Sequence, residues 1–172
     1  KVKMENPDMI VYLIFTNKEN FFGFSKTIKL KERPKKTKTY PHELDWKLTR
    51  VMINLIGIKQ GETICDPFCG TGTTLLEAES MGIHAIGVDF DKKMFKIAKE
   101  NIKENKFKSE IINADFQEML KISEKYNGIV TDLPYGLNSK TSEKPEEVLK
   151  RFISILPKRK KVAIMYKKEL GD

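Results

Sequence analysis

The chain has few of the residues on which several classes of protein depend. Only two of its 172 residues are cysteines and only two are histidines, so a disulfide framework is excluded and a Cys/His zinc site lacks ligands. No apolar run is long enough to cross a membrane, and no secretory segment is present. We therefore expect a soluble, cytoplasmic protein with reduced thiols, no metal and no membrane partner.

Acidic residues are outnumbered by basic ones, which gives a net charge of +8 and favours a polyanionic partner. With 40% hydrophobic residues, the chain has room for one main α/β domain with a core, plus a small appendage. Seven basic residues and Pro34 lie between residues 26 and 39, with little apolar content. We expect a basic linker there, either a solvated connector or a strip that contacts a nucleic-acid backbone.

The N-terminal residues predict a β-hairpin. Residues 9–16 and 20–25 are rich in β-branched and aromatic residues and flank a turn at residues 17–20. A hairpin alone is marginally stable, so we expect it to belong to a larger sheet or to a domain whose beginning is missing. The first residue, Lys1, is not a methionine, which agrees with a missing start.

From residue 43 onward the hydrophobic pattern alternates between helical and extended periods. Helices are expected at 43–56, 72–81, 91–105 and 146–156, with a short helix at 115–122. Strands are expected at 63–66, 84–89, 110–113, 128–132 and 161–166. Strict alternation of this kind predicts an α/β fold with a doubly wound, mostly parallel sheet and helices on both faces.

A glycine-rich turn follows the first of these strands and predicts a cofactor site. Its expected binding residues are Asp66, Pro67, Phe68, Gly70, Gly72 and Thr73. A dinucleotide site would need a third glycine where Leu75 stands. A carboxylate at Asp66 would also repel a pyrophosphate, whereas it would attract the ammonium group of S-adenosylmethionine. We therefore favour S-adenosylmethionine over NAD.

Further cofactor contacts are expected at the next two strand ends, where ligands of doubly wound sheets bind. Asp89 would accept hydrogen bonds from the ribose hydroxyls, and Phe90 would flank the adenine. Asp115 would accept from the adenine amine, while the backbone amide of Phe116 donates to a ring nitrogen. Two alternatives remain open: Asp115 as a simple helix cap and Phe90 as an ordinary core residue.

The strand at 128–132 ends in Asp132-Leu133-Pro134-Tyr135, followed by Gly136, a set suited to holding a flat base by its amino group. The Asp132 carboxylate and the Leu133 carbonyl would each accept one N–H, which directs the nitrogen lone pair toward a methyl group. Pro134 fixes the backbone and Tyr135 supplies a stacking face. The alternative is a structural turn. No covalent intermediate is required, and Cys69 is better explained as a packing thiol.

These motifs resemble the class I S-adenosylmethionine-dependent methyltransferases of the THUMP-associated group, which methylate the exocyclic amine of guanine in tRNA. Asp66 to Gly72 are similar to that group's cofactor motif, and Asp132 to Gly136 to its amine-binding motif. Leu133 points to the archaeal and eukaryotic type that acts on guanosine 10. The resemblance covers residues 40–166 and implies S-adenosylmethionine as cofactor and tRNA as partner.

The resemblance also implies a domain organisation. Residues 1–25 look like the end of a THUMP-like RNA-binding domain, and residues 40–172 form the methyltransferase domain, here without its last edge strands. The family's usual His-Pro pair is reversed at Pro41-His42, which leaves His42 without an assigned role. Two other functions remain open: an N6-adenine or N4-cytosine amino methyltransferase acting on DNA or rRNA, and a non-catalytic RNA-binding module.

Overall fold

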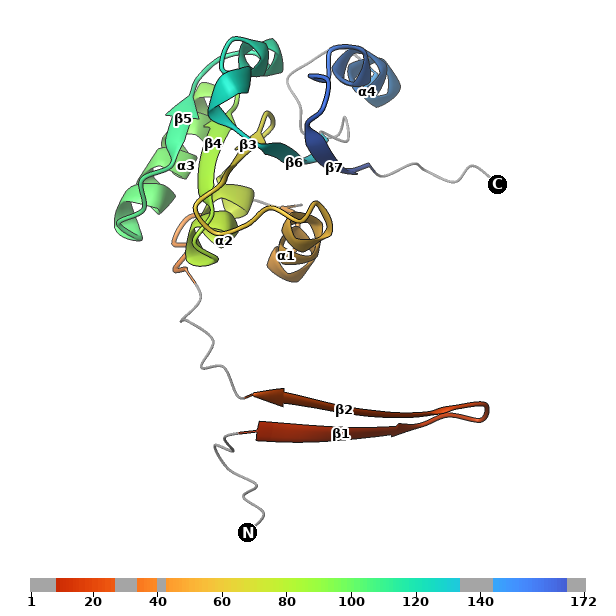
Figure 1. Cartoon of the computed structure of the whole chain (residues 1–172). Coiled ribbons are helices and arrows are strands. Elements are labelled where there is room, and N and C mark those ends of the chain that lie inside the picture. The colour runs from red at the N-terminus through yellow and green to blue at the C-terminus, as the bar shows by residue number, and fades with distance from the viewer. Residues whose placement is uncertain (1–8, 27–33, 40–42, 134–143, 167–172) are drawn as a thin grey trace. The chain divides into compact units, whose positions relative to one another are not determined.

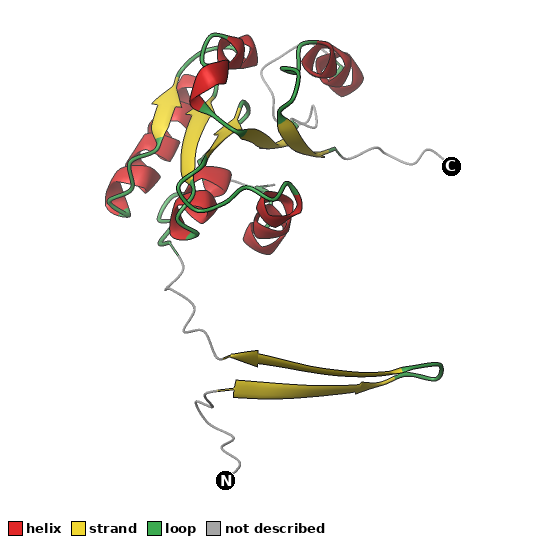
Figure 2. Cartoon of the chain, in the orientation of Figure 1, coloured by secondary structure: helices red, strands yellow, loops and turns green. Residues whose placement is uncertain are grey.

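The computed structural model describes residues 9–26, 34–39, 43–133 and 144–166 (Figures 1 and 2). The chain divides into two compact units, one ending at residue 32 and the other beginning at residue 33.

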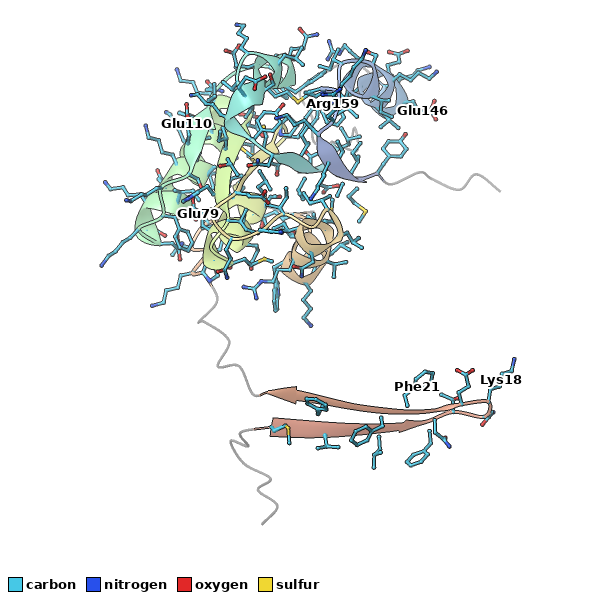
Figure 3. All side chains as sticks on the ribbon, in the orientation of Figure 1. Lys18, Phe21, Glu79, Glu110, Glu146 and Arg159 are labelled. Carbon is cyan, nitrogen blue, oxygen red and sulfur yellow. The ribbon has the colours of Figure 1, made fainter. Side chains whose placement is uncertain are left out.

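The smaller unit is the expected β-hairpin. Strands β1 (Met9–Phe15) and β2 (Asn20–Lys26) pair antiparallel, and the Thr16 hydroxyl closes the turn by donating to the Glu19 carbonyl at 2.6 Å. Large apolar side chains stand exposed along both strands, among them Phe21 (Figure 3). The exposed apolar residues of the hairpin are Met9, Val11, Leu13, Phe15, Phe21, Phe22 and Phe24.

The described residues of the larger unit form five parallel strands in the spatial order β5-β4-β3-β6-β7. Their bounds are β3 Thr63–Asp66, β4 His84–Val88, β5 Glu110–Ile112, β6 Gly128–Asp132 and β7 Lys161–Met165. The chain moves outward from β3 to β5 and then returns to place β6 beside β3. The strand order therefore reverses between β3 and β6, and ligands of doubly wound sheets bind at the carboxyl ends of such a pair.

The α-helices in the described part of this unit are α1 Trp46–Leu55, α2 Thr73–Ser80, α3 Lys92–Glu104 and α4 Pro145–Ser154, and they connect or flank these strands. The expected cap at Asp91 is confirmed, since its carboxylate accepts from the Lys93 amide at 2.7 Å. The short helix expected at 115–122 is confirmed, as a 3₁₀ helix rather than an α-helix. Two short 3₁₀ turns, η1 Phe116–Leu120 and η2 Ser123–Lys125, occupy this region, and bonds between residues three apart close η1.

Both faces of the sheet are buried, as a doubly wound fold requires. Successive strand residues point to opposite faces, so Ile64 and Val130 pack with helices α1 and α2, whereas Cys65 and Ile129 pack with η1 and α4. Each face has its own apolar cluster. The prediction of a doubly wound parallel sheet is confirmed, with every described strand pair of the larger unit parallel.

The second half of the basic segment lies against α3. The Lys35 amide donates to the Asn105 side chain at 2.8 Å, and the Asn101 side chain donates to the Lys38 carbonyl at 3.1 Å. These amide side chains satisfy backbone groups that a solvated connector would expose to water. Residues 34–39 therefore belong to the larger unit, although the sequence placed them in a linker spanning 26–39.

Candidate active site

The glycine turn between β3 and α2 adopts the left-handed backbone conformation that glycine accommodates, with φ of 53° at Gly70 and 88° at Gly72. A β-carbon at Gly70 would meet no atom of the described residues within 4 Å, so none of these residues fills the space beside the backbone there. At Gly72 it would meet the Ala98 β-carbon of α3 at 3.4 Å. Gly70 thus leaves room beside the turn, and Gly72 permits close packing of α3. Pro67 and Thr73, at either side of this turn, are buried.

Asp89, directly after β4, fastens this turn to the neighbouring strand. Its two carboxylate oxygens accept from the Gly70 amide and the Asp91 amide, both at 2.8 Å. Burial raises the pKa of Asp89, and these two amide bonds oppose the rise. A carboxylate accepts up to about four hydrogen bonds, so two amide donors do not exhaust its capacity for ligand hydroxyls.

Asp66, at the end of β3, lies beneath the turn with only 3% of its surface exposed. It accepts from the Thr131 hydroxyl of β6 at 2.7 Å and from the Phe68 amide at 3.1 Å. Burial is the main cause that raises the pKa of Asp66 to about 7; hydrogen bonds lower it, and the nearby Asp132 raises it. Asp66 therefore joins the two central strand ends where the strand order reverses.

Asp132 and Leu133 close β6 beside this buried carboxylate. Leu133 is buried in the apolar cluster, and its amide donates to the Met165 carbonyl of β7 at 3.1 Å. Its backbone is therefore held in the sheet. Asp132 is partly exposed. Pro134 and Tyr135, the other two residues expected in the catalytic loop, lie outside the described residues.

The aromatic residues of the predicted cofactor site divide into two groups. Phe68 and Phe116 pack against each other with ring centroids 5.0 Å apart, and both pack against Phe152 of α4. Their rings belong to the core, which leaves the backbone as the part of these residues that can serve a ligand. Phe90, by contrast, is 43% exposed, so the alternative that it is a core residue is wrong.

Asp115 caps η1, because its carboxylate accepts from the Gln117 amide at 3.0 Å. The alternative of a cap is therefore correct, and it leaves a cofactor contact possible through the other oxygen. The Asn113 side chain donates to the Asp89 carbonyl at 2.8 Å and to the Phe90 carbonyl at 3.1 Å. Asn113, which the sequence did not single out, thus fixes the backbone that carries Asp89 and Phe90.

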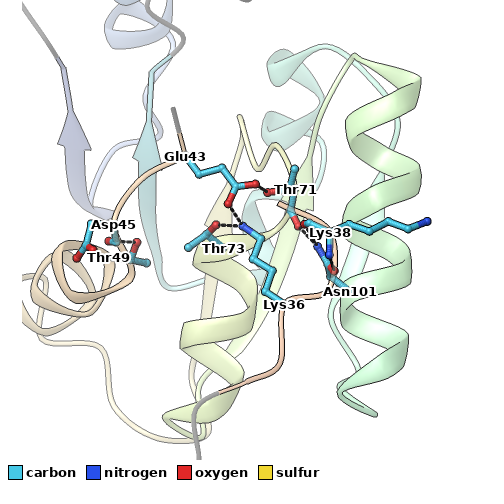
Figure 4. A network of polar contacts seen from close by, with 8 residues as sticks. All are labelled: Lys36, Lys38, Glu43, Asp45, Thr49, Thr71, Thr73 and Asn101. Atoms are coloured by element: carbon cyan, nitrogen blue, oxygen red, sulfur yellow. Dashed lines mark hydrogen bonds and ion pairs between the residues drawn. The ribbon is translucent and has the colours of Figure 1, made fainter. Parts of the chain in front are cut away.

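A polar network upstream of the site was also missed (Figure 4). Glu43 accepts from the Thr71 hydroxyl of the glycine turn at 2.5 Å and pairs with the Lys36 ammonium at 2.5 Å. Lys36 also donates to the Thr73 hydroxyl. The fully buried Asn101 donates to the Thr71 carbonyl at 3.0 Å. The segment that precedes α1 is therefore tied directly to the turn.

Both cysteines are buried free thiols, and burial raises the pKa of each well above its usual value. Cys69 belongs to the apolar cluster, which is the environment of a packing thiol rather than of an activated nucleophile. No cluster of three or more His, Cys, Asp or Glu side chains suited to a metal ion occurs among the described residues. In the same residues, no helix has the length and apolar character that crossing a membrane requires.

The strand order, the glycine turn and the acids at successive strand ends define a doubly wound α/β domain built to bind a nucleotide-like cofactor. Residues 33–169 match the family described as UPF0020: RMKL-like, methyltransferase domain, and the chain belongs to this family.

Two curated relatives share much of the sequence. The tRNA (guanine(10)-N2)-dimethyltransferase of Methanothermobacter thermautotrophicus is 36% identical over 161 residues, which cover 89% of this chain and 48% of the relative. The enzyme of the same name from Methanocaldococcus jannaschii is 30% identical over 187 residues, which cover 99% of this chain and 52% of the relative. The chain thus spans about half the length of these relatives.

The fold is also found in a solved structure, TrmN from Thermus thermophilus. The two share a TM-score of 0.54 and 22% sequence identity, over 78% of this chain and 42% of that one. At this identity the likeness supports the fold alone.

Proposed function

We propose that this protein transfers a methyl group from S-adenosylmethionine to the exocyclic N2 amine of a guanosine in tRNA, at position 10. One observation carries the proposal: the glycine turn follows β3, Asp132 and Leu133 close the neighbouring strand β6, and the 2.7 Å bond from Thr131 to Asp66 joins the two strand ends. The names of the two curated relatives support the choice of substrate.

The residues at the strand ends fit S-adenosylmethionine. Asp89 accepts from the ribose hydroxyls, the exposed Phe90 ring flanks the adenine, and Asp115 accepts from the adenine amine. The Phe116 amide donates to a ring nitrogen, and Asp66 attracts the ammonium group. The space beside Gly70, which none of the described residues fills, allows a ligand to approach the backbone. When bound, the cofactor supplies an electrophilic methyl group on a positively charged sulfur.

Asp132 and Leu133 activate the amine. A base amine is a weak nucleophile because its lone pair is delocalised into the ring. The Asp132 carboxylate accepts one N–H and the Leu133 carbonyl the other, and both acceptors strengthen as positive charge develops on the nitrogen. The buried side chain and the bonded amide of Leu133 hold its α-carbon, from which this carbonyl extends, beside Asp132. Pro134 stiffens the loop, Tyr135 stacks on the base, and the surplus proton leaves to Asp132 or water.

The test is transfer of labelled methyl from S-adenosylmethionine to an unmodified tRNA transcript, followed by a nucleoside digest. We expect label in N2-methylated guanosine, and none in a transcript whose tenth nucleotide is not guanosine. Equal labelling of both transcripts would exclude position 10. Label on adenine N6 or cytosine N4 would favour the alternative amino methyltransferase.

The domain organisation is part of the proposal. We infer that residues 1–25 belong to a THUMP-like RNA-binding domain, because a hairpin with apolar side chains exposed on its strands is marginal alone. With tRNA as substrate, we place the protein in the cytoplasm. A non-catalytic RNA-binding module is the remaining rival. Calorimetry with S-adenosylhomocysteine distinguishes the two functions. A folded chain that does not bind this reaction product would favour the RNA-binding module.

A further inference from the structure

Helix α3 carries a row of exposed lysines on one face. Lys92, Lys96, Lys99 and Lys103 recur at helical spacing, so they lie within about 60° of one another around the helix axis. Neighbouring members have β-carbons about 5–6 Å apart. The row, called here the lysine stripe, runs for about 16 Å along the helix. Figure 3 shows long side chains extending from the outer side of α3.

The two acidic residues of α3 are engaged elsewhere. Glu100 pairs with Lys38, and Glu104 accepts from the Thr37 hydroxyl, so both turn toward the segment at residues 34–39. Within the described part of the chain, none of the four stripe lysines forms an ion pair, although Lys99 lies 5.7 Å from the Phe95 ring. The helix therefore separates its charges and presents a purely basic face.

Other exposed lysines differ in this respect. Lys121 pairs with Glu118 at 2.8 Å, and Lys125 pairs with Glu110 at 3.5 Å, so their charges are partly compensated. Isolated surface pairs of that kind are common and contribute little to stability. Four unpaired lysines in one row instead create a local positive field that suits a chain of phosphates.

The stripe begins close to the candidate site. Lys92 is the first residue of α3 and follows Asp89, Phe90 and Asp91, at the carboxyl end of β4. A polyanion lying along α3 would therefore pass the edge of the site. We propose that the lysine stripe binds the phosphate backbone of the RNA substrate and positions it beside the catalytic centre. This inference rests on the proposed function, because RNA is taken as the substrate.

The experiment replaces the four stripe lysines together by glutamine, which has similar helix propensity and leaves α3 intact. Binding of a fluorescent tRNA transcript to the full chain is measured across a salt series. We expect at least about tenfold weaker binding near 100 mM salt, and a log–log salt slope shallower by about three, since each phosphate contact contributes about 0.7–0.9.

A matched control removes the same charge elsewhere. Lys47, Lys59, Lys150 and Lys158 are exposed residues outside α3, and their combined replacement by glutamine also lowers the net charge by four. We expect the control to bind tRNA within about twofold of the wild type. Equal weakening in both variants, or unchanged binding in the stripe variant, would overturn the proposal.

Two further readouts separate this proposal from the proposed function. Affinity for S-adenosylhomocysteine should stay unchanged in the stripe variant, and methyl transfer should show a raised KM for tRNA with kcat retained. A wild-type chain that binds tRNA without methylating it would contradict the proposed function. The comparison of tRNA binding between the stripe variant and the control would still show whether the lysine stripe binds RNA. A wild-type chain without tRNA affinity would overturn the proposal for the lysine stripe. The same holds if the stripe variant binds tRNA normally and has lost only its binding to phosphatidylserine vesicles.

Discussion

The Thr131 hydroxyl donates a 2.7 Å hydrogen bond to the Asp66 carboxylate and so links the strand that ends in the candidate amine-binding loop to the strand that opens the glycine turn. Asp66 is almost fully buried, and burial raises its pKa to about 7. Because this pKa is raised above the unfolded value near 4, the folded state holds an extra proton between about pH 4 and pH 7. The contribution of Asp66 to stability is therefore lost as pH rises through that window.

Replacing Thr131 by valine should destabilise the protein more at pH 8 than at pH 5. At pH 8 the variant leaves an ionised, buried carboxylate without one donor, which costs about 2–3 kcal/mol, whereas at pH 5 only a neutral bond of about 1 kcal/mol is lost. Urea unfolding at the two pH values measures the difference. Thr131→Ser keeps the hydroxyl and serves as the control; equal effects of valine and serine would contradict the prediction.

Cofactor binding should be linked to proton release from Asp66. If this carboxylate attracts the cofactor ammonium, binding must ionise it, so affinity for S-adenosylhomocysteine should rise between pH 5.5 and pH 7. Calorimetry in two buffers of different ionisation enthalpy measures the released protons. Asp66→Asn should abolish the buffer dependence. A wild-type protein whose binding enthalpy is the same in both buffers would show that Asp66 does not serve the ammonium.

The pair formed by Lys36 and Glu43 should stabilise the glycine turn cooperatively. Lys36→Met and Glu43→Gln are each expected to cost about 2 kcal/mol, because each leaves a largely buried charge without its partner. The double variant should lose less than the sum, by about 0.5–3 kcal/mol. Lys38→Met, which breaks an exposed pair with Glu100, is the control and should destabilise the protein far less than either of these variants. If the two single effects on stability simply add in the double variant, the pair does not stabilise the turn cooperatively.

Phe90 and Phe116 should respond oppositely to replacement by alanine. Phe90 is exposed, so its loss should change stability by less than about 0.5 kcal/mol while weakening S-adenosylhomocysteine binding about fivefold or more. Phe116 is packed in the aromatic cluster, so its loss should cost about 3–5 kcal/mol of stability. Thermal unfolding measures the change in stability, and calorimetry on the same samples measures the change in affinity for S-adenosylhomocysteine. Unaltered ligand affinity in Phe90→Ala would remove its ring from the cofactor site.

The sequence predicted the parallel sheet well because its signals are local. The strands at 63–66 and 128–132 are short apolar runs that end in an aspartate, and the structure confirms both bounds. The caps and turns could be predicted for the same reason, as at Asp91, whose own side chain closes the helix start. A short helix could be predicted near Phe116–Leu120, but its 3₁₀ type could not, because apolar spacing over five residues does not distinguish a 3₁₀ helix from an α-helix.

The site residues could be predicted only in part, because their neighbours are distant in sequence. Glu43 lies 28 residues before Thr71, and Thr131 lies 65 residues after Asp66, yet both pairs are hydrogen bonded. No periodic pattern signals such contacts. The sequence also cannot show whether an aromatic side chain faces the core or the solvent, and this distinguishes Phe116 from Phe90.

In the proposed mechanism, Asp132 accepts an N–H of the target amine and so activates it for methyl transfer. The most direct measurement is the single-turnover rate of Asp132→Asn with saturating S-adenosylmethionine and tRNA. The asparagine is isosteric, so folding and both binding affinities should be retained, while the rate falls by about a hundredfold or more. A folded variant that transfers methyl within about threefold of the wild-type rate would contradict the account.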